Sequence, residues 1–301
     1  MPLWIPITIV AALCQCWRTA MQQKLRGVLS VNAATFVRFS YGMPAALVYL
    51  LAALIGSGSL PQPSWATLGY AAGGGLFQIL ATNLLIMAFG YRNFAVGTAY
   101  AKTETVQTAI IALVLLDEAL RPLAWAGIAV GLVGVMTLSL ARRGLRPREL
   151  VAATVQPAAL CGLGAGFMFA MTAIFIKLAS RSVASPSVFV RALFVLFLTT
   201  VLQTLMQGAY LLTREPHELR KTLRDWRRAC WAGILSASGS ACWFIGFALT
   251  DVALVRSLGQ IEVIFTLGFS RFYLKERLKP GDAWGLLLVA CGVLLIVVSS
   301  A

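Results

Sequence analysis

Apolar segments long enough to cross a membrane alternate with short polar segments along nearly the whole chain. A helix needs about 20 apolar residues to cross the hydrocarbon core of a bilayer. Open strands are disfavoured there because they leave backbone groups unsatisfied in lipid. The pattern therefore predicts an all-α polytopic membrane protein with ten transmembrane helices. We place them near residues 4–23, 31–55, 65–89, 94–116, 122–141, 155–178, 186–212, 228–249, 252–273 and 282–300.

Two stretches of this pattern, residues 94–122 and 252–280, resemble each other. Residue types recur between them at a constant offset of 158 residues, and a second set recurs at an offset of 153. This internal similarity predicts two five-helix repeats, at residues 1–142 and 153–301, joined by a linker at 143–152. The matched pairs include Glu104 with Glu262, Glu118 with Glu276, Pro122 with Pro280, and Arg38 with Arg191.

The loop charges indicate that the second repeat is inverted. Five helices are an odd number, so the second repeat enters the membrane from the side opposite to the first. Loop 56–64 carries no charge, whereas its counterpart at 213–228 carries six Lys or Arg. Because basic loops stay in the cytoplasm, this reversal predicts a cytoplasmic linker and places both termini on the periplasmic, outer side.

The composition supports this interpretation and excludes other classes. Hydrophobic residues make up 59% of the chain and charged residues 12%, whereas a soluble domain has about 25% charged residues. The net charge of +14 would suggest nucleic acid in a soluble protein, but here the basic residues gather in loops and set orientation. We expect membrane lipids as partners and no nucleic acid. The six cysteines follow no metal or disulfide spacing and no nucleotide-binding loop occurs, so neither a metal nor a cofactor is expected.

The two repeats end in similar acidic turns, LLDEALRP and YLKERLKP, each before the last helix of its repeat. With the duplicated five-helix unit and the short loops, these turns resemble the ten-helix EamA-type transporters of the drug/metabolite transporter superfamily. Members often have Gly-Glu at this turn, where this chain has Asp117-Glu118 and Lys275-Glu276. The resemblance covers nearly the whole chain and implies a secondary transporter of the bacterial inner membrane, not an enzyme.

The resemblance leaves the cargo open. Several similar members export amino acids, aromatic ones included, or related metabolites. Relatives in the superfamily move drugs, sugars, nucleotide sugars and lipid-linked sugars. We therefore expect export of small metabolites by alternating access, with a multidrug transporter or a lipid-linked-sugar flippase as the alternative. A membrane-embedded lipid-modifying enzyme is a remote alternative, since His217 is the single histidine and falls in a charged loop.

Ionisable residues inside the apolar segments are the candidates for a binding site. Each costs roughly 2.5 to 3.5 kcal/mol in the membrane, so such residues face a cavity or each other. Glu104 and Glu262 are expected near the midplane, where inverted-repeat transporters bind substrate. The alternative is a carboxylate held by a neighbouring Lys or Arg for structure alone. The expected substrate-binding residues are Tyr100, Glu104, Gln107, Gln78, Asn83, Trp17, Trp243, Gln260 and Glu262.

Three basic residues in the spans are expected to gate the pathway or to pair with charges: Arg38, Arg191 and Lys102. Inversion predicts Arg38 and Arg191 at equal depth on opposite sides of the membrane, where an Arg fork suits a carboxylate or phosphate. The alternative is that both side chains extend toward the nearer interface.

Glycines in the last helix of each repeat predict close helix packing, within the chain or between two chains. Ten helices suffice to enclose a pathway, so a monomer is expected and a homodimer stays open.

Overall fold

The computed structural model describes residues 2–25, 29–91, 94–143, 154–224, 226–272 and 280–300. These residues are helical apart from short connections, and their one strand-like contact is an isolated antiparallel bridge between Gln62 and Ala184. The linker predicted at 143–152 lies outside the described residues from residue 144 onward, as do Lys275 and Glu276 of the second acidic turn.

Six helical segments are long and apolar enough to cross a membrane: Val31–Ser57, Trp65–Ala88, Ala99–Leu116, Pro157–Arg181, Val188–Arg214 and Ala229–Leu249. Shorter apolar helices cover Trp4–Arg18, Pro122–Leu138 and Ala283–Ser299. These segments agree with nine of the predicted spans and make the chain a polytopic, all-helical membrane protein.

The chain divides into two compact units, and each takes segments from both predicted repeats. Unit 1 comprises residues 1–79 and 172–250, and unit 2 comprises residues 80–171 and 251–301. Helices α4 (Trp65–Gly90) and α9 (Pro157–Arg181) contribute residues to both units.

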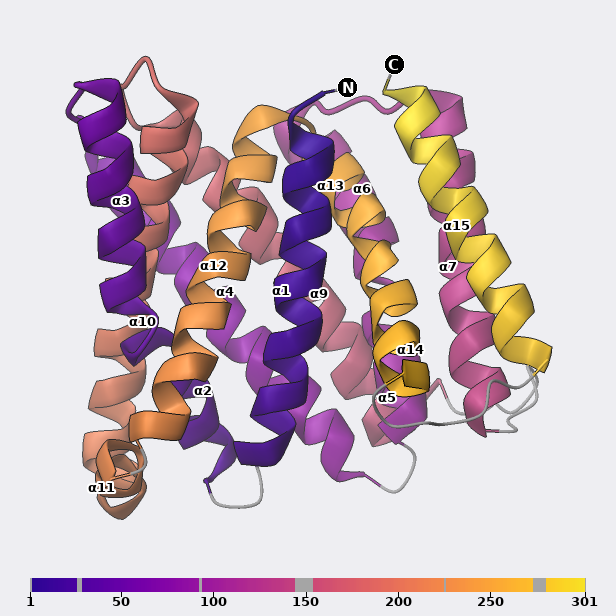
Figure 1. Cartoon of the computed structure of the whole chain (residues 1–301), viewed down its shortest axis with the longest axis horizontal. Coiled ribbons are helices and arrows are strands. Elements are labelled where there is room, and N and C mark those ends of the chain that lie inside the picture. Colours follow the sequence, from indigo (N-terminus) through magenta and orange to yellow (C-terminus); the bar gives the residue numbers. More distant parts are fainter. Residues whose placement is uncertain are drawn as a thin grey trace. The chain divides into compact units, whose positions relative to one another are not determined.

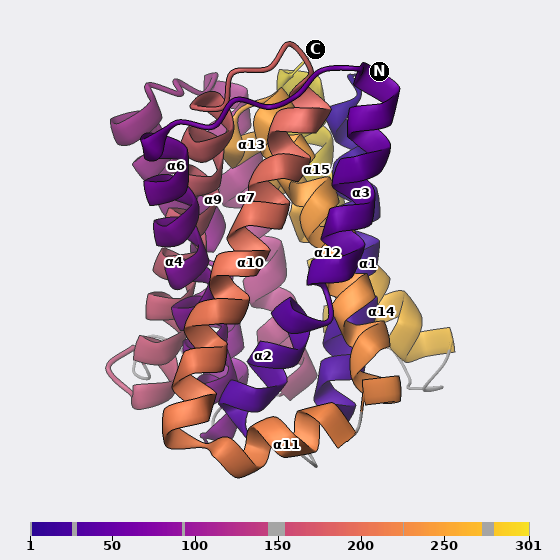
Figure 2. The ribbon, with the colours of Figure 1, turned by 90° about the vertical axis from the view of Figure 1, so that its left-hand side faces the viewer.

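Unit 1 is built from helices that pack around α10 and α12. Its other elements are α1, which packs along α12, and α2, α3 and α11, which contact α10 and α12. Figure 2 shows α10, α12 and α2 together, with the short α11 crossing below them. The bounds are α1 (Trp4–Leu25), α2 (Val31–Ser40), α3 (Met43–Ser57), α10 (Val188–Arg214), α11 (Pro216–Arg224) and α12 (Trp226–Leu249).

The span predicted as one helix at 31–55 is broken at Tyr41 and Gly42, between α2 and α3. Pro44 stands in the first turn of α3, where its missing N–H costs no hydrogen bond. The break also presses against α12, because a Cβ on Gly42 would lie 3.1 Å from the carbonyl oxygen of Gly233. Glycine at both positions lets the broken segment touch the helix backbone.

Unit 2 contains two further broken segments, α5–α6 and α13–η1–α14, together with the paired helices α7 and α15 (Figure 1). The bounds are α5 (Phe94–Ala101), α6 (Glu104–Leu116), α7 (Pro122–Arg143), α13 (Val252–Leu258), η1 (Gly259–Ile261), α14 (Glu262–Phe272) and α15 (Pro280–Ser299).

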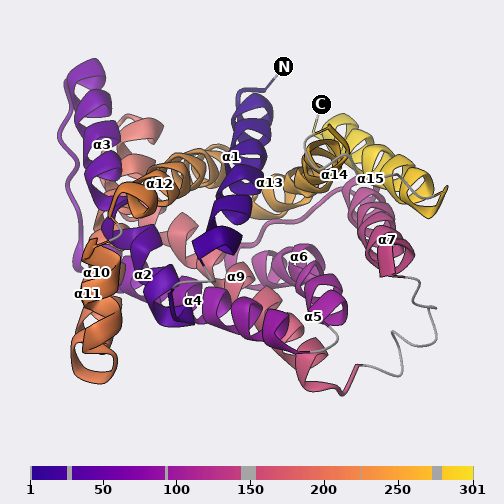
Figure 3. The same cartoon turned by 60° about the horizontal axis from the view of Figure 1, so that its bottom comes forward.

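The predicted glycine faces meet within the chain. Helices α7 and α15 lie side by side (Figures 1 and 3). A Cβ on Gly292 would lie 2.6 Å from the backbone nitrogen of Gly131, and one on Gly134 would lie 2.7 Å from the nitrogen of Val289. Such distances leave no room for a larger side chain, so these glycines serve packing between the last helices of the two repeats.

Candidate functional site

The two repeated polar stretches coincide with two helix breaks in unit 2. Helix α5 ends at Ala101 and α6 begins at Glu104, while α13 ends at Leu258 and α14 begins at Glu262 after the 3₁₀ turn η1. The spans predicted at 94–116 and 252–273 are therefore each interrupted by a break, at corresponding positions. Each repeated glutamate is the first residue of a half-helix, where the helix dipole stabilises a carboxylate.

Local hydrogen bonds fix the first break. The backbone N–H groups of Lys102 and Thr103 donate to the carbonyls of Ala99 and Tyr100, each at 3.1 Å. The Thr103 hydroxyl also donates to the Tyr100 carbonyl, at 2.6 Å. These bonds reach back three residues instead of four, which tightens the chain into a turn and frees carbonyls of the preceding helix.

Two ion pairs cross between the repeated stretches. Glu104 Oε1 lies 2.7 Å from Arg256 Nη1, and their side chains are 18% and 11% exposed. Lys102 Nζ lies 3.5 Å from Glu262 Oε2, and these side chains are 29% and 14% exposed. Each pair takes its acid from one stretch and its base from the other. Four charges that would be costly in an apolar span thus neutralise one another.

Amides and hydroxyls extend this polar cluster. Gln260 Nε2 donates to Thr105 Oγ1 at 3.0 Å, and Gln107 Nε2 donates to Thr103 Oγ1 at 2.8 Å. The Tyr100 hydroxyl bonds the Thr154 hydroxyl. Unit 2 thus contains six of the predicted substrate-binding residues, five of them held by these ion pairs and hydrogen bonds: Tyr100, Glu104, Gln107, Gln260, Glu262 and the half-buried Asn83.

Glycine permits the close contact of Gln260 with α7. A Cβ on Gly131 would lie 2.7 Å from Gln260 Oε1. Gln260 Oε1 and Gln107 Oε1 are buried and accept no hydrogen bond from the described residues. Each amide therefore keeps an acceptor available inside the cluster.

The first acidic turn holds the second broken segment in place. Glu118 is 5% exposed, and its Oε2 accepts the backbone N–H of Val252 at 2.8 Å. A carboxylate at the first turn of α13 satisfies a backbone donor that the helix leaves open and interacts favourably with its dipole. Asp117 has a φ of 54°, in the left-handed region where glycine is favoured and Asp is tolerated. The backbone at this position would therefore also suit glycine.

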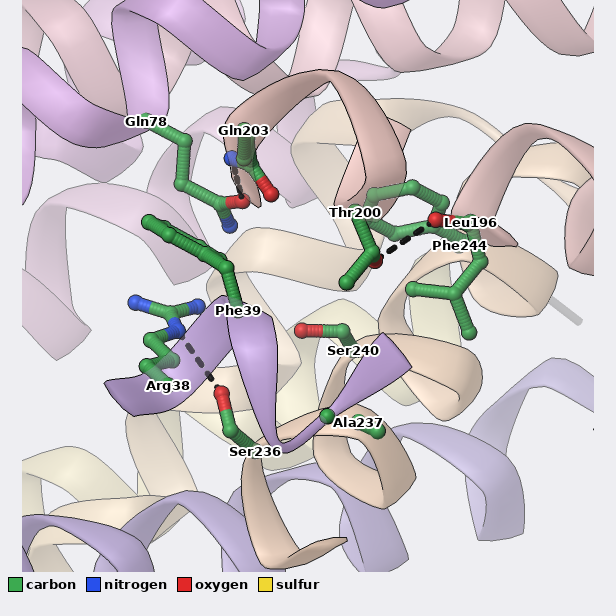
Figure 4. A pocket seen from close by; sticks show the side chains of 11 residues that line it. Arg38, Phe39, Gln78, Leu196, Thr200, Gln203, Ser236, Ala237, Ser240 and Phe244 are labelled. Atoms are coloured by element: carbon green, nitrogen blue, oxygen red, sulfur yellow. Dashed lines mark hydrogen bonds between the residues drawn. The ribbon is translucent and has the colours of Figure 1, made fainter. Parts of the chain in front are cut away.

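Unit 1 contains a separate polar pocket around Arg38 (Figure 4). Its cavity volume is about 10 Å³, which is room for about one water molecule. Arg38 is 5% exposed, and its Nε donates to Ser236 Oγ at 2.7 Å. The lining residues are Arg38, Phe39, Gly42, Gln78, Leu196, Thr200, Gln203, Ser236, Ala237, Ser240 and Phe244.

The pocket combines one cationic side chain with neutral polar and aromatic walls. Gln203 Nε2 donates to Gln78 Oε1 at 2.7 Å and to the Gly75 carbonyl at 3.2 Å. In Figure 4, Phe39 lies between this amide pair and the Arg38 guanidinium. Arg38 is buried and bonds Ser236 of α12. The pocket thus places one cationic group beside amide and aromatic walls, and it would have to open to admit an organic anion.

Gln203 was not among the site residues predicted from the sequence. It is almost fully buried, and its amide in the apolar stretch 186–212 was the signal that could have identified it. Ser236 and Ser240 are also polar residues within an apolar span, at a spacing of four that puts both on one helix face.

Three other predicted site residues lie outside this pocket's lining. Trp243 donates from Nε1 to Gln15 Oε1 at 3.1 Å and stacks on Phe247. Trp17 is 65% exposed. Arg191 donates from Nη1 to the Ser185 carbonyl at 3.1 Å, close to the start of its own helix. Arg38 and Arg191 therefore occupy different surroundings, although the sequence pairs them.

Comparisons with known proteins agree with this architecture. No curated protein matches the chain. A crystal structure of a protein with 18% sequence identity superposes with a TM-score of 0.75, covering 98% of this chain and 95% of that one, which shows that the fold is shared. The EamA-like transporter family matches residues 2–140 and 156–298. Since these two segments span nearly the whole chain, the protein belongs to the EamA-like transporter family.

Proposed function

We propose that this protein is a secondary transporter of the bacterial inner membrane that exports small metabolites, with amino acids, aromatic ones included, as its substrates. Family membership supports transport of drugs or metabolites. The observation that carries the finer proposal is the pair of crossed ion pairs, Glu104 with Arg256 and Lys102 with Glu262, at two matching helix breaks.

A zwitterionic substrate fits this cluster for an electrostatic reason. An amino acid brings one ammonium and one carboxylate. When an ion pair of the cluster separates, the ammonium can bind the freed Glu and the carboxylate the freed Arg or Lys, so no net charge is left in a weakly polar site. Leaving one charge of a buried ion pair without a partner costs several kcal/mol. A zwitterion avoids this loss because it gives each of the two charges a new partner. Gln107 and Gln260 offer additional hydrogen bonds to the same substrate.

The mechanism we propose is alternating access by two inverted five-helix repeats, residues 1–142 and 153–301, with ten transmembrane helices in all. Discontinuous helices at corresponding positions are typical of such transporters and line their binding sites. Each ion pair takes one residue from each repeat and so holds the two repeats together. A substrate that separates these ion pairs therefore also permits the repeats to move. Arg38 would hold the substrate carboxylate as a gate along the pathway, because a guanidinium binds carboxylates through two parallel hydrogen bonds.

The basic loops give the orientation. We infer that these loops and the linker at 143–152 face the cytoplasm, and that both termini face the periplasm. The substrate then leaves the cell, driven by its own gradient or by a proton gradient.

An export assay tests the proposal. Cells that overexpress the chain are loaded with a panel of amino acids as dipeptides, and amino acids in the medium are measured against cells that express the Glu104→Gln variant. Faster release of at least one amino acid by the native chain, and resistance to its toxic analogue, is expected. Resistance to drugs alone, or lipid-dependent movement of a lipid-linked sugar, would replace the amino-acid proposal with one of the alternatives.

A further inference from the structure

Helix α11 separates acidic from basic side chains. The sequence REPHELRK suggested a loop with mixed charges, but the structure has a helix at Pro216–Arg224. Pro216 at its start, Glu218 in its first turn and Arg224 in its last turn all favour a helix here. Glu218 and Thr222, four residues apart, form its buried face. The opposite face is available to the surroundings.

The buried face fastens α11 to the start of α2. Glu218 Oε2 accepts the backbone N–H of Ser30 at 2.8 Å. Glu215, just before α11, accepts the Ser30 hydroxyl at 2.5 Å and the Asn32 amide at 2.7 Å. Burial disfavours ionisation of Glu218, but hydrogen bonds from Lys221 and Ser30 outweigh this effect and lower the pKa of the carboxyl. Both described acids of this segment thus bind the N-terminus of α2.

The exposed face is basic. Arg220 and Arg224 of α11 and Arg214, the last residue of α10, are exposed and form no ion pair with any described residue. Lys221 is also exposed, and its Nζ contacts Glu218 at 2.6 Å. The excess positive charge of the segment therefore points outward, whereas its negative charge points into the fold.

Apolar side chains accompany these charges. Leu223 is 62% exposed and Trp226 is 52% exposed. The Arg227 guanidinium lies 5.6 Å from the centroid of the Trp226 ring. Exposed tryptophan is enriched at the level of lipid headgroups, and an amphipathic helix with basic and apolar side chains lies in the membrane interface. Helix α11 runs between the ends of α10 and α12 (Figure 2). We expect a membrane surface at this level.

We propose that the exposed face of α11, with Arg220 and Arg224, together with Arg214 at the end of α10, binds the phosphate of anionic phospholipid headgroups. Arginine suits this ligand because its planar fork donates two hydrogen bonds to phosphate oxygens. A leaflet with anionic lipids attracts each basic residue near its surface. A bound lipid also supports α2, since Glu215 and Glu218 hold that helix, and α2 carries Arg38 in the pocket. The proposal is independent of the transported substrate.

Lipid-dependent stability tests the proposal. The full chain is purified in detergent, and its melting temperature is measured with increasing phosphatidylglycerol or phosphatidylcholine. Phosphatidylglycerol is expected to raise the melting temperature more. The triple variant Arg214→Gln, Arg220→Gln, Arg224→Gln is expected to need on the order of 100-fold more phosphatidylglycerol for the same rise, from roughly fivefold per charge.

Two controls distinguish a site from general charge. The variant Arg142→Gln, Arg143→Gln, Arg146→Gln removes the same charge near the linker and should respond to phosphatidylglycerol as the native chain does. Lysine at the same three positions should restore only part of the response, because lysine keeps the charge but lacks the planar fork. Equal loss in both glutamine variants, or an equal rise with inorganic phosphate alone, would overturn the proposal.

Discussion

Glu104 Oε1 and Arg256 Nη1 lie 2.7 Å apart and join the two repeats through the shortest ion pair of the polar cluster in unit 2. The two residues stand at matching helix breaks. Neither break nor pairing follows from the neighbours of each residue in the sequence, since Lys102 is closer along the chain to Glu104 than Arg256 is. The ion pair therefore depends on how the broken segments pack.

Substituting one partner of this ion pair should lower the stability of the protein more than substituting both. Glu104→Gln leaves Arg256 without its carboxylate, and Arg256→Gln leaves Glu104 without its base. Each is expected to reduce stability by about 3 kcal/mol, whereas the double variant should recover much of this loss. Melting temperatures in detergent measure the stability, and uptake into proteoliposomes should stay low in all three variants. Additive losses in the double variant would show that the two charges act independently.

The pair Lys102–Glu262 provides a matched comparison. Its longer distance of 3.5 Å and its greater exposure predict a smaller loss, about 1 kcal/mol, for Lys102→Gln or Glu262→Gln. Raised salt should reduce this contribution more than that of Glu104 and Arg256, because exposed charges are screened. The same melting experiment at low and high salt checks the order of the two pairs.

Arg38 and Arg191 should differ in their effect on transport. Arg38→Gln removes a buried guanidinium from the pocket and is expected to raise KM by about 10- to 100-fold, as loss of a charged hydrogen bond does. Arg191→Gln removes only a bond to the Ser185 carbonyl and should change KM by about twofold or less. Transport assays over a range of substrate concentrations compare the two. Equal effects would instead support the paired gates suggested by the sequence.

Asp117 should respond to substitution according to its backbone. At a φ of 54°, Asp117→Gly relieves steric conflict and is expected to stabilise the protein by about 0.5 to 1 kcal/mol. Asp117→Val places a branched side chain in the same conformation and should destabilise it by about 1 to 2 kcal/mol. Melting temperatures of both variants measure the effect. The opposite order would indicate that the Asp117 carboxylate, rather than the backbone, matters at this turn.

The lowered pKa of Glu218 predicts that the protein loses stability in acid. Burial alone would raise its pKa, but hydrogen bonds from Lys221 and Ser30 outweigh burial and lower the pKa in the folded protein. The stabilisation is therefore present above the unfolded pKa, about 4.3, and is lost as the pH falls through the lower folded value. Glu218→Gln should melt at a lower temperature than the native chain at pH 7, and the difference should shrink below about pH 4. Melting curves across this range check the prediction, and a difference that is independent of pH would contradict it.

The sequence alone determined the membrane-spanning class, the duplicated architecture and the positions of Glu104 and Glu262 within apolar segments. These features depend on hydropathy and on internal similarity, which are properties of the chain itself. The family match agrees with the membrane class and the duplication. The sequence also indicated that glycines of the last helix in each repeat would pack closely, because only small side chains permit such an approach.

Only the tertiary structure decided which charges pair, where the helices break and which way each polar side chain points. Residues 94–116 include no proline that would stop a helix. The break at Lys102 was therefore not predictable from local helix propensity. Gln203 meets Gln78 from a distant segment, and Glu218 turns inward because the start of α2 offers backbone donors. Such pairings require atoms within about 3 Å of each other. The packing of segments remote in sequence brings them to that distance.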